Sequence, residues 1–543
     1  MLQKFLLHAW ALSQLLQWLP GSDAASSDFT SACENIASQA ASITNTSAFF
    51  SNFVPAGTNL TFDNPTCDLA GVPPFQVTLA DMCRVSLNVS TSDSSGIIME
   101  AWLPTNWTGR FLSTGNGGLA GCIQYADLAY GAGLGFATVG ANNGHNGSSG
   151  QAFYEHPEVL KDFVYRSVHT NVIVGKEITK MFYGSAHNFS YYLGCSTGGR
   201  QGFKSVQDFP EDFDGVLAGA PGLKFSNLMS WLGRFFNILG TPDSPSFITT
   251  DQWLGLIHQN VLKQCDKIDG VEDGIIEDPN LCDYKPEELM CSPGSNSTDC
   301  LTPAQVDAVR QVFSPMYDLN GNLLYSKQQP GGENTVWVAP VYTSGQPISF
   351  VADWFHYVVY DPSRDVTTLN LTDYQIAEDL NPFNIATFEG NLSDFKSRNG
   401  KLMTFHGQAD MLVSPADTEL YYNYVSRTMG LPPQDMDQFM RLYRISGMSH
   451  CFGGDGAWEF GQSLAGAGND LTAEALDPER NALTALVRWV EEGVAPDTLL
   501  GTKYVNDTPS LGVEFSRKHC RYPLRNTYSG VGDSSVAESW SCQ

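Results

Sequence analysis

The segment Gly194-Cys195-Ser196-Thr197-Gly198 places a serine hydroxyl between two glycines. Small residues on both sides of a serine permit the tight strand-to-helix turn on which a nucleophilic hydroxyl is exposed above a sheet. A strand-like run, FSYYLG at 189–194, precedes Ser196, and the helix-like GGRQGFKSVQDFPEDF follows it. We therefore predict that Ser196 is a nucleophile and that the backbone N–H of Thr197 helps to stabilise an oxyanion.

Two residues far downstream suit the acid and the base that would activate such a serine. Asp410 ends the strand-like run KLMTFHGQAD, and His450 lies in the glycine-rich loop SGMSHCFGG. The order Ser, Asp, His along the chain is that of α/β-hydrolases. The rival acid Asp417 lies in what reads as the beginning of a helix, PADTELYYNYV. A surface aspartate and a structural histidine are the alternatives for Asp410 and His450 taken singly.

A cysteine adjoins each end of this arrangement, because Cys195 precedes Ser196 and Cys451 follows His450. A disulfide between the two cysteines would hold the hydroxyl and the imidazole within hydrogen-bonding reach, although they are 254 residues apart in the sequence. Closing so long a loop stabilises a fold by roughly 5 kcal/mol in the chain-entropy model. We expect a covalent clamp, with pairing of the two cysteines elsewhere as the alternative.

A second glycine-rich stretch, STGNGGLAGC at 113–122, precedes the serine and follows another apolar run. Hydrolases of the α/β class take their other oxyanion donor from a loop in this place. We predict that Gly117 supplies this N–H, with Gly118 as the nearest alternative. An ordinary glycine turn would look the same in sequence.

The overall charge excludes several classes of partner. The net charge is −28 and the isoelectric point about 4.5, so nucleic acids and anionic membrane surfaces would be repelled. Hydrophobic residues make up 42% of the chain and charged residues 16%, which is typical of a compact globular enzyme. We expect no nucleic-acid or membrane partner, and an uncharged ligand such as a sugar or a phenolic ester.

Several features indicate a secreted, extracellular protein. Residues 1–24 read as a signal peptide with one lysine, an apolar run and small residues at its end, the alternative being an amphipathic first helix of the mature fold. The twelve cysteines are an even number, as expected for disulfides. Ten asparagines lie in Asn-X-Ser/Thr frames that glycans can occupy: Asn45, Asn59, Asn88, Asn106, Asn146, Asn188, Asn296, Asn370, Asn391 and Asn506.

The remaining pattern predicts an α/β fold with an insertion. Apolar runs at 97–104, 110–118, 136–143, 189–194 and 215–221 read as strands, with a long helix at 156–184 between them. This rhythm lapses into aromatic-rich segments from about 225 to 390 and resumes with strands at 400–410 and 440–451 and a helix at 481–493. We predict a mostly parallel sheet flanked by helices in residues 25–224 and 391–543, and an inserted domain at 225–390.

The motifs GCSTGG, HGQAD and the Ser-His-Cys of MSHC resemble those of the tannase and feruloyl esterase family of fungal serine esterases. The resemblance runs from about residue 26 to the C-terminus. It implies an α/β-hydrolase domain with a large lid, and a disulfide between the neighbours of the catalytic serine and histidine. By the same resemblance Ser196 is the nucleophile, His450 is general base and then general acid, and Asp410 orients the imidazole.

The acidic segment CDKIDGVEDGIIEDPNLC, at 265–282, forms a further candidate site. Carboxylates and carbonyls in a tight loop could supply the oxygen ligands of Ca²⁺, although the EF-hand spacing is missing and a solvated acidic turn is equally consistent with composition. The resemblance implies a structural calcium ion in the lid. It implies side-chain ligands Asp266, Asp269 and Asp273 and carbonyl ligands Val271 and Ile275.

Short separations suggest the further disulfides Cys265–Cys282, Cys291–Cys300 and Cys520–Cys542. Cys33, Cys67, Cys83 and Cys122 then remain, and the sequence alone permits three pairings of these four. The family resemblance implies Cys33–Cys83 and Cys67–Cys122.

We therefore expect a secreted carboxylic ester hydrolase that forms an acyl-enzyme on Ser196 and releases ferulate or related hydroxycinnamates from plant cell-wall polysaccharide, with no organic cofactor. A tannase acting on galloyl esters is the alternative within the family, disfavoured because 225–390 has no Lys-Arg pair that would serve as a processing site. A binding protein on a hydrolase fold and a metal-dependent esterase using Asp266 are alternatives of other classes. The sequence leaves the oligomeric state open.

Overall fold

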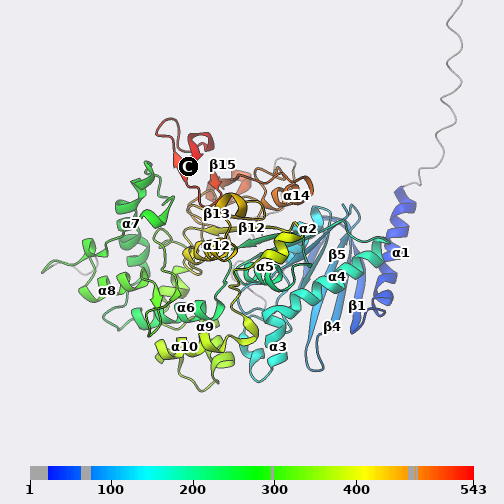
Figure 1. Cartoon of the computed structure of the whole chain (residues 1–543), viewed down its shortest axis with the longest axis horizontal. Helices are drawn as coiled ribbons and strands as arrows, with labels where there is room; N and C mark the ends of the chain where they lie inside the picture. The colour runs from blue at the N-terminus through cyan, green and yellow to red at the C-terminus, as the bar shows by residue number, and fades with distance from the viewer. Residues whose placement is uncertain (1–21, 63–74, 295–298, 463–470, 473–474) are drawn as a thin grey trace, which may run out of the picture.

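The computed structural model describes residues 22–62, 75–294, 299–462, 471–472 and 475–543 (Figure 1). Most of the expected signal peptide, together with Cys67 and Asn296, lies outside the described residues. The first helix, α1 (Ser22–Ala40), begins just before the expected end of that peptide. In the described part of the chain no helix combines the length and the apolar character needed to cross a bilayer.

A nine-stranded sheet forms the centre of the protein, and its order is β1-β4-β5-β7-β6-β8-β9-β12-β13. Five of its eight pairings, those from β7 to β13, are parallel, and the three that join β1, β4, β5 and β7 are antiparallel. The expected α/β class with a mostly parallel sheet is therefore confirmed. The strands are β1 (Thr46–Val54), β4 (Met82–Ser90), β5 (Gly96–Pro104), β6 (Arg110–Thr114), β7 (Phe136–Ala141), β8 (Phe189–Cys195), β9 (Gly215–Gly219), β12 (Lys401–Gly407) and β13 (Met440–Ile445).

Helices cover both faces of this sheet. Successive side chains of a strand point to opposite sides, so each strand contributes to the core on both faces. In β8, Tyr192 packs with the core beneath α1, α4 (Ser167–Tyr183), α5 (Thr197–Asp208) and α12 (Pro415–Met429). Tyr191 and Leu193 pack with α2 (Tyr125–Gly133) and α14 (Ala482–Glu492) on the other face. Strand β8 is thus almost wholly buried, which is why its sequence is a continuous apolar run rather than an alternating one.

The long helix expected at 156–184 is one helical stretch with a local irregularity. It consists of α3 (Pro157–Lys161), a π-helical turn (Asp162–Arg166) and α4. The N-terminal residues add two strands that were not predicted from the sequence, β1 and β4, at one edge of the sheet. A small separate pair, β2 (Asn59–Thr61) and β3 (Phe75–Val77), lies between them in sequence.

The described residues of the 225–390 segment form five α-helices, several short 3₁₀- and π-helical turns and one short strand pair, and none of them joins the central sheet. The helices lie together on the side of the sheet away from α1 (Figure 1). Their core also includes Leu119 and Met411, which follow β6 and β12, so the segment packs over the carboxyl ends of the strands. The elements are α6 (Phe225–Leu239), α7 (His258–Cys265), α8 (Pro303–Val312), β10 (Met316–Tyr317), β11 (Leu323–Tyr325), α9 (Ser349–Trp354) and α10 (Leu371–Leu380).

Most aromatic residues of this segment form its own core. Trp231, Phe235, Trp253, Trp354 and Phe355 are each fully buried. They stabilise the segment and cannot face a ligand.

The C-terminal residues form two small antiparallel pairs that the sequence analysis did not predict. These pairs are β14 (Thr498–Tyr504) with β15 (Val513–Cys520), and β16 (Asn526–Tyr528) with β17 (Trp540–Cys542). An isolated bridge between Tyr443 and Arg521 ties them to β13. Two further short helices, α11 (Ser393–Ser397) and α13 (Pro433–Met436), precede β12 and β13.

Candidate active site

Ser196 occupies the sharp turn between β8 and α5, with φ +64° and ψ −121°. Such a backbone conformation is strained for a residue with a side chain, and it directs the side chain outward. The neighbouring glycines are required by close approach. A Cβ at Gly199 would lie 2.2 Å from the carbonyl oxygen of Gly219, and one at Gly198 would lie 3.0 Å from that of Asn116. The local sequence therefore fixes a half-buried serine hydroxyl at the carboxyl end of the central strand.

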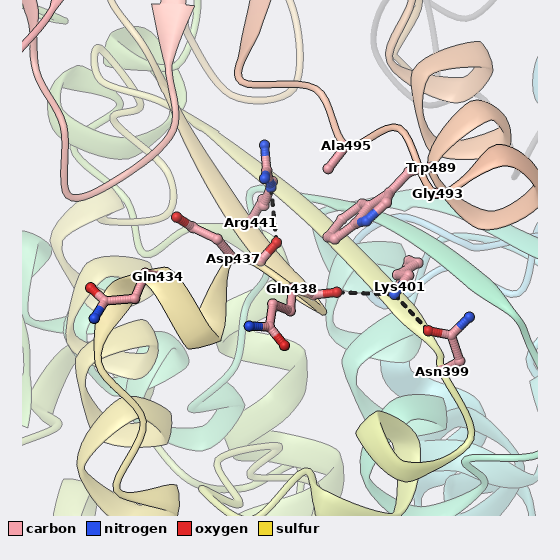
Figure 2. A pocket seen from close by; sticks show the side chains of 9 residues that line it. All are labelled: Asn399, Lys401, Gln434, Asp437, Gln438, Arg441, Trp489, Gly493 and Ala495. Atoms are coloured by element: carbon pink, nitrogen blue, oxygen red, sulfur yellow. Dashed lines mark hydrogen bonds between the residues drawn. The ribbon is translucent and has the colours of Figure 1, made fainter.

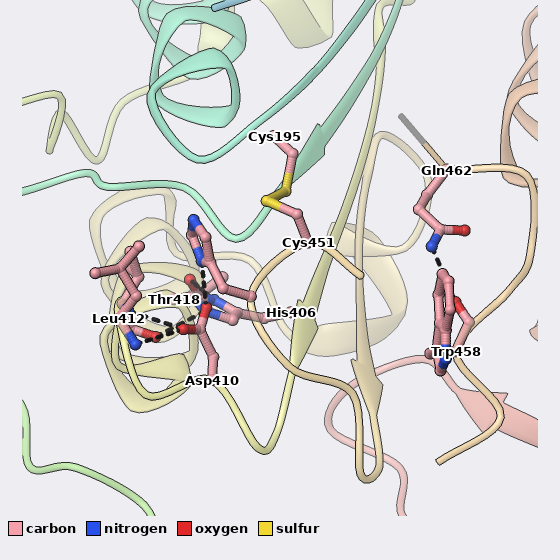
Figure 3. Close-up of a disulfide and its surroundings, with 10 residues drawn as sticks. Cys195, His406, Asp410, Leu412, Thr418, Cys451, Trp458 and Gln462 are labelled. Carbon is pink, nitrogen blue, oxygen red and sulfur yellow. Dashed lines mark hydrogen bonds and ion pairs between the residues drawn. A yellow bond between two sulfur atoms is a disulfide. The ribbon is translucent and has the colours of Figure 1, made fainter. Parts of the chain in front are cut away.

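A disulfide joins Cys195 to Cys451, with their Cα atoms 6.0 Å apart (Figure 3). Both cysteines are buried. The bond connects the end of β8 to the loop after β13, so it brings the residues next to each cysteine, Ser196 and His450, to the same place in the fold.

His450 is held by a buried carboxylate. Its Nδ1 lies 2.7 Å from Oδ2 of Asp410, while Oδ1 of Asp410 accepts the backbone N–H groups of Leu412 at 2.8 Å and Val413 at 2.9 Å. Burial alone would raise the pKa of Asp410, but the charge of His450 and the hydrogen bonds of the two neighbouring histidines, His406 and His450, outweigh it and hold that pKa well below its usual range. Asp410 therefore stays ionised, and Nδ1 of His450 carries the hydrogen of the shared bond.

The serine hydroxyl and the second imidazole nitrogen remain available for reaction. Among the described residues, neither Oγ of Ser196 nor Nε2 of His450 takes part in a hydrogen bond. Catalytic hydrogen bonds are often long before substrate binds and tighten in the complex. The protein thus presents an oriented imidazole and a free hydroxyl on two loops that a disulfide joins.

The loop after β6 lies against the beginning of α5. Its Asn116 donates its backbone N–H to the side chain of Gln201 at 3.0 Å, and the hydroxyl of Thr197 donates to the carbonyl of Gly118 at 2.7 Å. Within the described part of the chain, the backbone N–H groups of Gly117 and Thr197 have no acceptor. Both expected oxyanion donors are therefore free to bind an anion.

Two residues beside this site were not predicted from sequence. His406, on β12, places Nε2 3.0 Å from Oδ2 of Asp410. Trp337, from the 225–390 segment, lies edge-on to His450 with the ring centroids 5.7 Å apart. By contrast Asp417, the rival acid, lies on α12, where its Oδ1 accepts from Ser326 at 3.3 Å, and it makes no contact with His450. His406 belongs to the same HGQAD motif as Asp410, and this closeness in sequence is the signal that could have identified it.

The acidic loop at 266–273 is only partly arranged as a cation site. Asp266 accepts the N–H of Gly274 at 3.1 Å through Oδ2, and Asp269 accepts that of Val271 at 2.9 Å through Oδ1. The other oxygens, Oδ1 of Asp266 and Oδ2 of Asp269, are buried without a partner. Burial raises the pKa of Asp269 to about 7. Two buried, unpaired carboxylate oxygens in one loop fit the chemistry of a Ca²⁺ ligand set.

The third expected side-chain ligand is engaged elsewhere. Oδ2 of Asp273 accepts a hydrogen bond from Arg517 at 2.7 Å, and Oδ1 accepts the N–H of Ile275 at 3.1 Å. In the described ranges no group of three or more His, Cys, Asp or Glu side chains is placed to hold a metal ion. A cation would therefore need Asp273 to turn from Arg517.

Four other disulfides join described residues: the three that short separations predict, and the Cys33–Cys83 pair that the family resemblance implies. They are Cys33–Cys83, Cys265–Cys282, Cys291–Cys300 and Cys520–Cys542. Cys122 is also disulfide-bonded, and its expected partner, Cys67, lies outside the described residues. Of the nine described asparagines in glycosylation frames, all are exposed except Asn88, which is half-buried on β4.

A hollow of about 330 Å³ lies at the amino ends of β12 and β13, whereas the site around Asp410 lies beyond their carboxyl ends (Figure 2). Lys401 and Arg441 lie over the ring of Trp489 there, at 5.5 and 5.4 Å from its centroid. Lys401 already donates to the side chain of Asn399 and the carbonyl of Gln438. A seven-residue strand spans about 20 Å, so the hollow is not part of the site around Asp410.

Comparisons with known proteins identify the family of the chain. The profile of the family described as "Tannase and feruloyl esterase" matches residues 83–543. A probable feruloyl esterase B-2 of Aspergillus oryzae is 51% identical over 538 residues, covering 98% of this chain and 99% of its own. A probable feruloyl esterase B-1 of Aspergillus flavus is 53% identical over 496 residues, covering 91% of this chain and 92% of its own.

Solved structures give the same result. The crystal structure of feruloyl esterase B from Aspergillus oryzae superposes with a TM-score of 0.89 at 47% identity, covering 95% of this chain and 100% of that one. A tannin acyl hydrolase from Aspergillus niger, 21% identical with a TM-score of 0.69 over 94% of this chain and 95% of its own, shares the fold. The fold and the profile match together show that the chain is an α/β-hydrolase that belongs to the tannase and feruloyl esterase family.

Proposed function

We propose that this protein is a carboxylic ester hydrolase that releases ferulate and related hydroxycinnamates from plant cell-wall polysaccharide. The observation that carries the proposal is the Asp410–His450 pair, held beside Ser196 by the Cys195–Cys451 disulfide. Relatives at about half identity over nearly the whole chain, named as feruloyl esterases, support the same activity.

We assign a role to each group of the site. Nε2 of His450 takes the proton of Ser196 Oγ as the oxygen attacks the ester carbonyl carbon, and Asp410 stabilises the imidazolium that results. The N–H groups of Gly117 and Thr197 bind the oxyanion. His450 then gives the proton to the alcohol oxygen as the carbon–oxygen bond of the ester breaks, leaving an acyl group on Ser196.

Water completes the cycle by the same route. His450 takes a proton from water, the hydroxide oxygen attacks the acyl carbon, and the proton returns to Ser196 as the acid leaves. The half-buried indole of Trp337 beside His450 supplies a flat apolar wall of the kind to which a phenolic ring or a sugar face binds.

An ester panel tests the assignment. Methyl ferulate, caffeate, p-coumarate and gallate are compared by kcat/KM on the wild type and on Ser196→Ala. We expect the three hydroxycinnamates to be hydrolysed at least about ten times better than gallate and the variant to lose about 10⁴-fold or more in kcat. Preference for gallate would replace this proposal with a tannase activity, and full activity of the variant would refute the role of Ser196.

We also propose that the protein is secreted and carries N-linked glycans. Its disulfides are typical of oxidising compartments, and eight of the nine described glycosylation frames have exposed asparagines. The mass of the secreted protein before and after endoglycosidase treatment, and an N-terminus near residue 25, would support the proposal. An unprocessed, unmodified chain would contradict it.

A structural Ca²⁺ ion is proposed for the loop at 266–273. Asp266, Asp269 and Asp273 would supply carboxylates, and Val271 and Ile275 would supply backbone carbonyls. The unpaired buried oxygens of Asp266 and Asp269 support this assignment. The ion would neutralise these carboxylates and hold the loop that Cys265–Cys282 closes, and no step of ester hydrolysis involves it.

A further inference from the structure

The carboxylate of Asp410 receives four N–H groups. Two of them come from histidines, whereas the proposed mechanism uses only one histidine, His450. Oδ1 accepts two backbone N–H groups, and Oδ2 lies 2.7 Å from Nδ1 of His450 and 3.0 Å from Nε2 of His406 (Figure 3). Asp410 is 0% exposed and His406 1% exposed. His406 therefore acts on the Asp410 carboxylate from within the core. It makes no hydrogen bond to Ser196 and has almost no solvent-exposed surface.

The contacts of His406 determine which nitrogen carries its hydrogen. Nε2 also lies 3.1 Å from the carbonyl oxygen of Val413, and a carbonyl can only accept. Nε2 is thus the N–H donor, shared between Val413 and Asp410. Nδ1 lies 2.7 Å from the hydroxyl of Thr418, a fully buried residue of α12, which donates to it when the ring is neutral.

A hydrogen-bonded chain therefore runs from helix α12 to the base. The Thr418 hydroxyl donates to His406, His406 donates to Asp410, and His450 donates to the same oxygen of Asp410. Each donor on a carboxylate oxygen disperses part of its negative charge. Two histidines that share one oxygen therefore compete for that charge.

We propose that His406 is a positioning residue, which fixes Asp410 in the orientation that receives His450 and, by sharing its oxygen, weakens the hold of Asp410 on the His450 imidazolium. This inference rests on the proposed esterase function. Its consequence is that His450 gives up its proton more readily, so the enzyme keeps a neutral base and remains active in a more acidic medium.

Other titratable groups lie around the hydrogen-bonded chain from Thr418 to His450. Their effect on the pH profile must be distinguished from that of His406. Asp417 faces His406 from α12, and burial raises its pKa, with Lys224 opposing the shift. Tyr325 and Tyr342 approach Asp410 from the 225–390 segment, and burial raises the pKa of both hydroxyls well above the usual value, so both remain neutral in acid. Asp417 is therefore the one of these three whose charge could change in the acidic range.

The test compares His406→Leu with His406→Gln on the full-length protein. Leucine removes the donor, whereas glutamine can place an N–H near the position of Nε2. We expect His406→Leu to lower kcat about 10- to 100-fold with KM within about twofold, because the lost bond is to a charged group and no substrate contact changes. We expect His406→Gln to restore kcat to within about fivefold of the wild type.

The pH profile is the measurement that a merely structural role would not change. In His406→Leu the acidic limb of kcat/KM should move to higher pH by about half to one unit, because Asp410 then holds the imidazolium more strongly. Thr418→Val should move it in the same direction by less. His519→Leu is the matched control: His519 is also fully buried and bonds to a carbonyl, that of Ala457, but does not touch Asp410.

Active sites are counted by titration with a fluorophosphonate, so that misfolded protein does not lower kcat. An unchanged limb and kcat per titrated site in His406→Leu would overturn the inference, as would an equal shift in Asp417→Asn. If His406→Leu does not fold, an unshifted acidic limb in Thr418→Val together with a loss of kcat in His406→Gln would overturn it. Lack of activity in the wild type on all four esters would refute the proposed function itself.

Discussion

The carboxylate beside His450 and those of Asp266 and Asp269 all have buried oxygens, yet these oxygens are supplied with hydrogen bonds in opposite ways. Asp410 receives four N–H groups, and its pKa is lowered despite burial. Asp266 and Asp269 each keep one buried oxygen without a partner, and burial raises the pKa of both. The protein itself supplies the hydrogen bonds that stabilise the negative charge of Asp410. The unpaired oxygens of Asp266 and Asp269 need either a proton or a cation to stabilise theirs.

The largest expected effect comes from exchanging one carboxylate for an amide in each region. Asp410→Asn should lower kcat about 10⁴-fold, because an amide cannot hold His450 in the tautomer that accepts the serine proton. Asp269→Asn should leave kcat within about twofold, since the loop takes no part in the proposed chemistry. Steady-state kinetics on methyl ferulate measure both values. A comparable loss in Asp269→Asn would mean that the acidic loop belongs to the catalytic machinery.

The next effect concerns how the active site is held together. Replacing both Cys195 and Cys451 by serine should lower the free energy of unfolding by about 2–4 kcal/mol and kcat by about tenfold or more, because the Ser196 and His450 loops lose their covalent tie. The matched control replaces Cys291 and Cys300, which close a much shorter loop and lie away from the site. Chemical denaturation and kcat per titrated site separate stability from chemistry. Equal losses of kcat in the two double variants would contradict the clamp.

The smallest effect is a pH-dependent change in stability at the acidic loop. The pKa of Asp269 in the folded protein, about 7, exceeds its ordinary value of 3.8. Between these values the folded state binds a proton that the unfolded state does not, so without Ca²⁺ stability should fall as the pH rises from about 4 to 7. Ca²⁺ binds the ionised form and should raise Tm by roughly 2–5 °C near pH 7 and by less near pH 4.

Calorimetry with Ca²⁺ or with a chelator checks this expectation, and Asp269→Asn serves as its control. The variant should lack the calcium response, and its stability should fall less with rising pH, because only Asp266 then keeps a raised pKa in this loop. A calcium response that survives in Asp269→Asn would place the ion elsewhere, and no response in the wild type would remove the proposed ion.

Local motifs made part of the active site predictable. The glycines around Ser196 could be recognised in the sequence as a motif. In the structure, the backbone of a neighbouring segment approaches each of them too closely for a larger side chain. Cys195 and Cys451 indicated a contact between distant loops because each lies next to a reactive residue. The expected family is confirmed by the comparisons with known proteins. The α/β class is also confirmed, and it could be predicted because the apolar runs of β8 and β9 reflect burial on both faces of a parallel sheet.

Other parts could not be predicted, since their partners are distant in sequence. Strand β1, TSAFFSNFV, mixes polar and apolar residues without the strict alternation that indicates a strand, and only its pairing with β4 makes it part of the sheet. Trp337 looked like the other aromatic residues of its segment, most of which are core, and its place beside His450 depends on how that segment packs over the strands. The C-terminal pairs β14–β15 and β16–β17 were missed for the same reason.

The sequence by itself determined the nucleophile turn, the alternation of strands and helices, and the candidate partners Asp410 and His450, because each of these depends on residues close together in the chain or on a short motif. Only the tertiary structure decided that Asp417 lies away from the imidazole, that His406 shares the carboxylate of Asp410, and that Asp273 is engaged by Arg517. Buried polar groups form hydrogen bonds with whichever partners the fold brings within about 3 Å. Those partners come from distant parts of the sequence, so no local pattern predicts them.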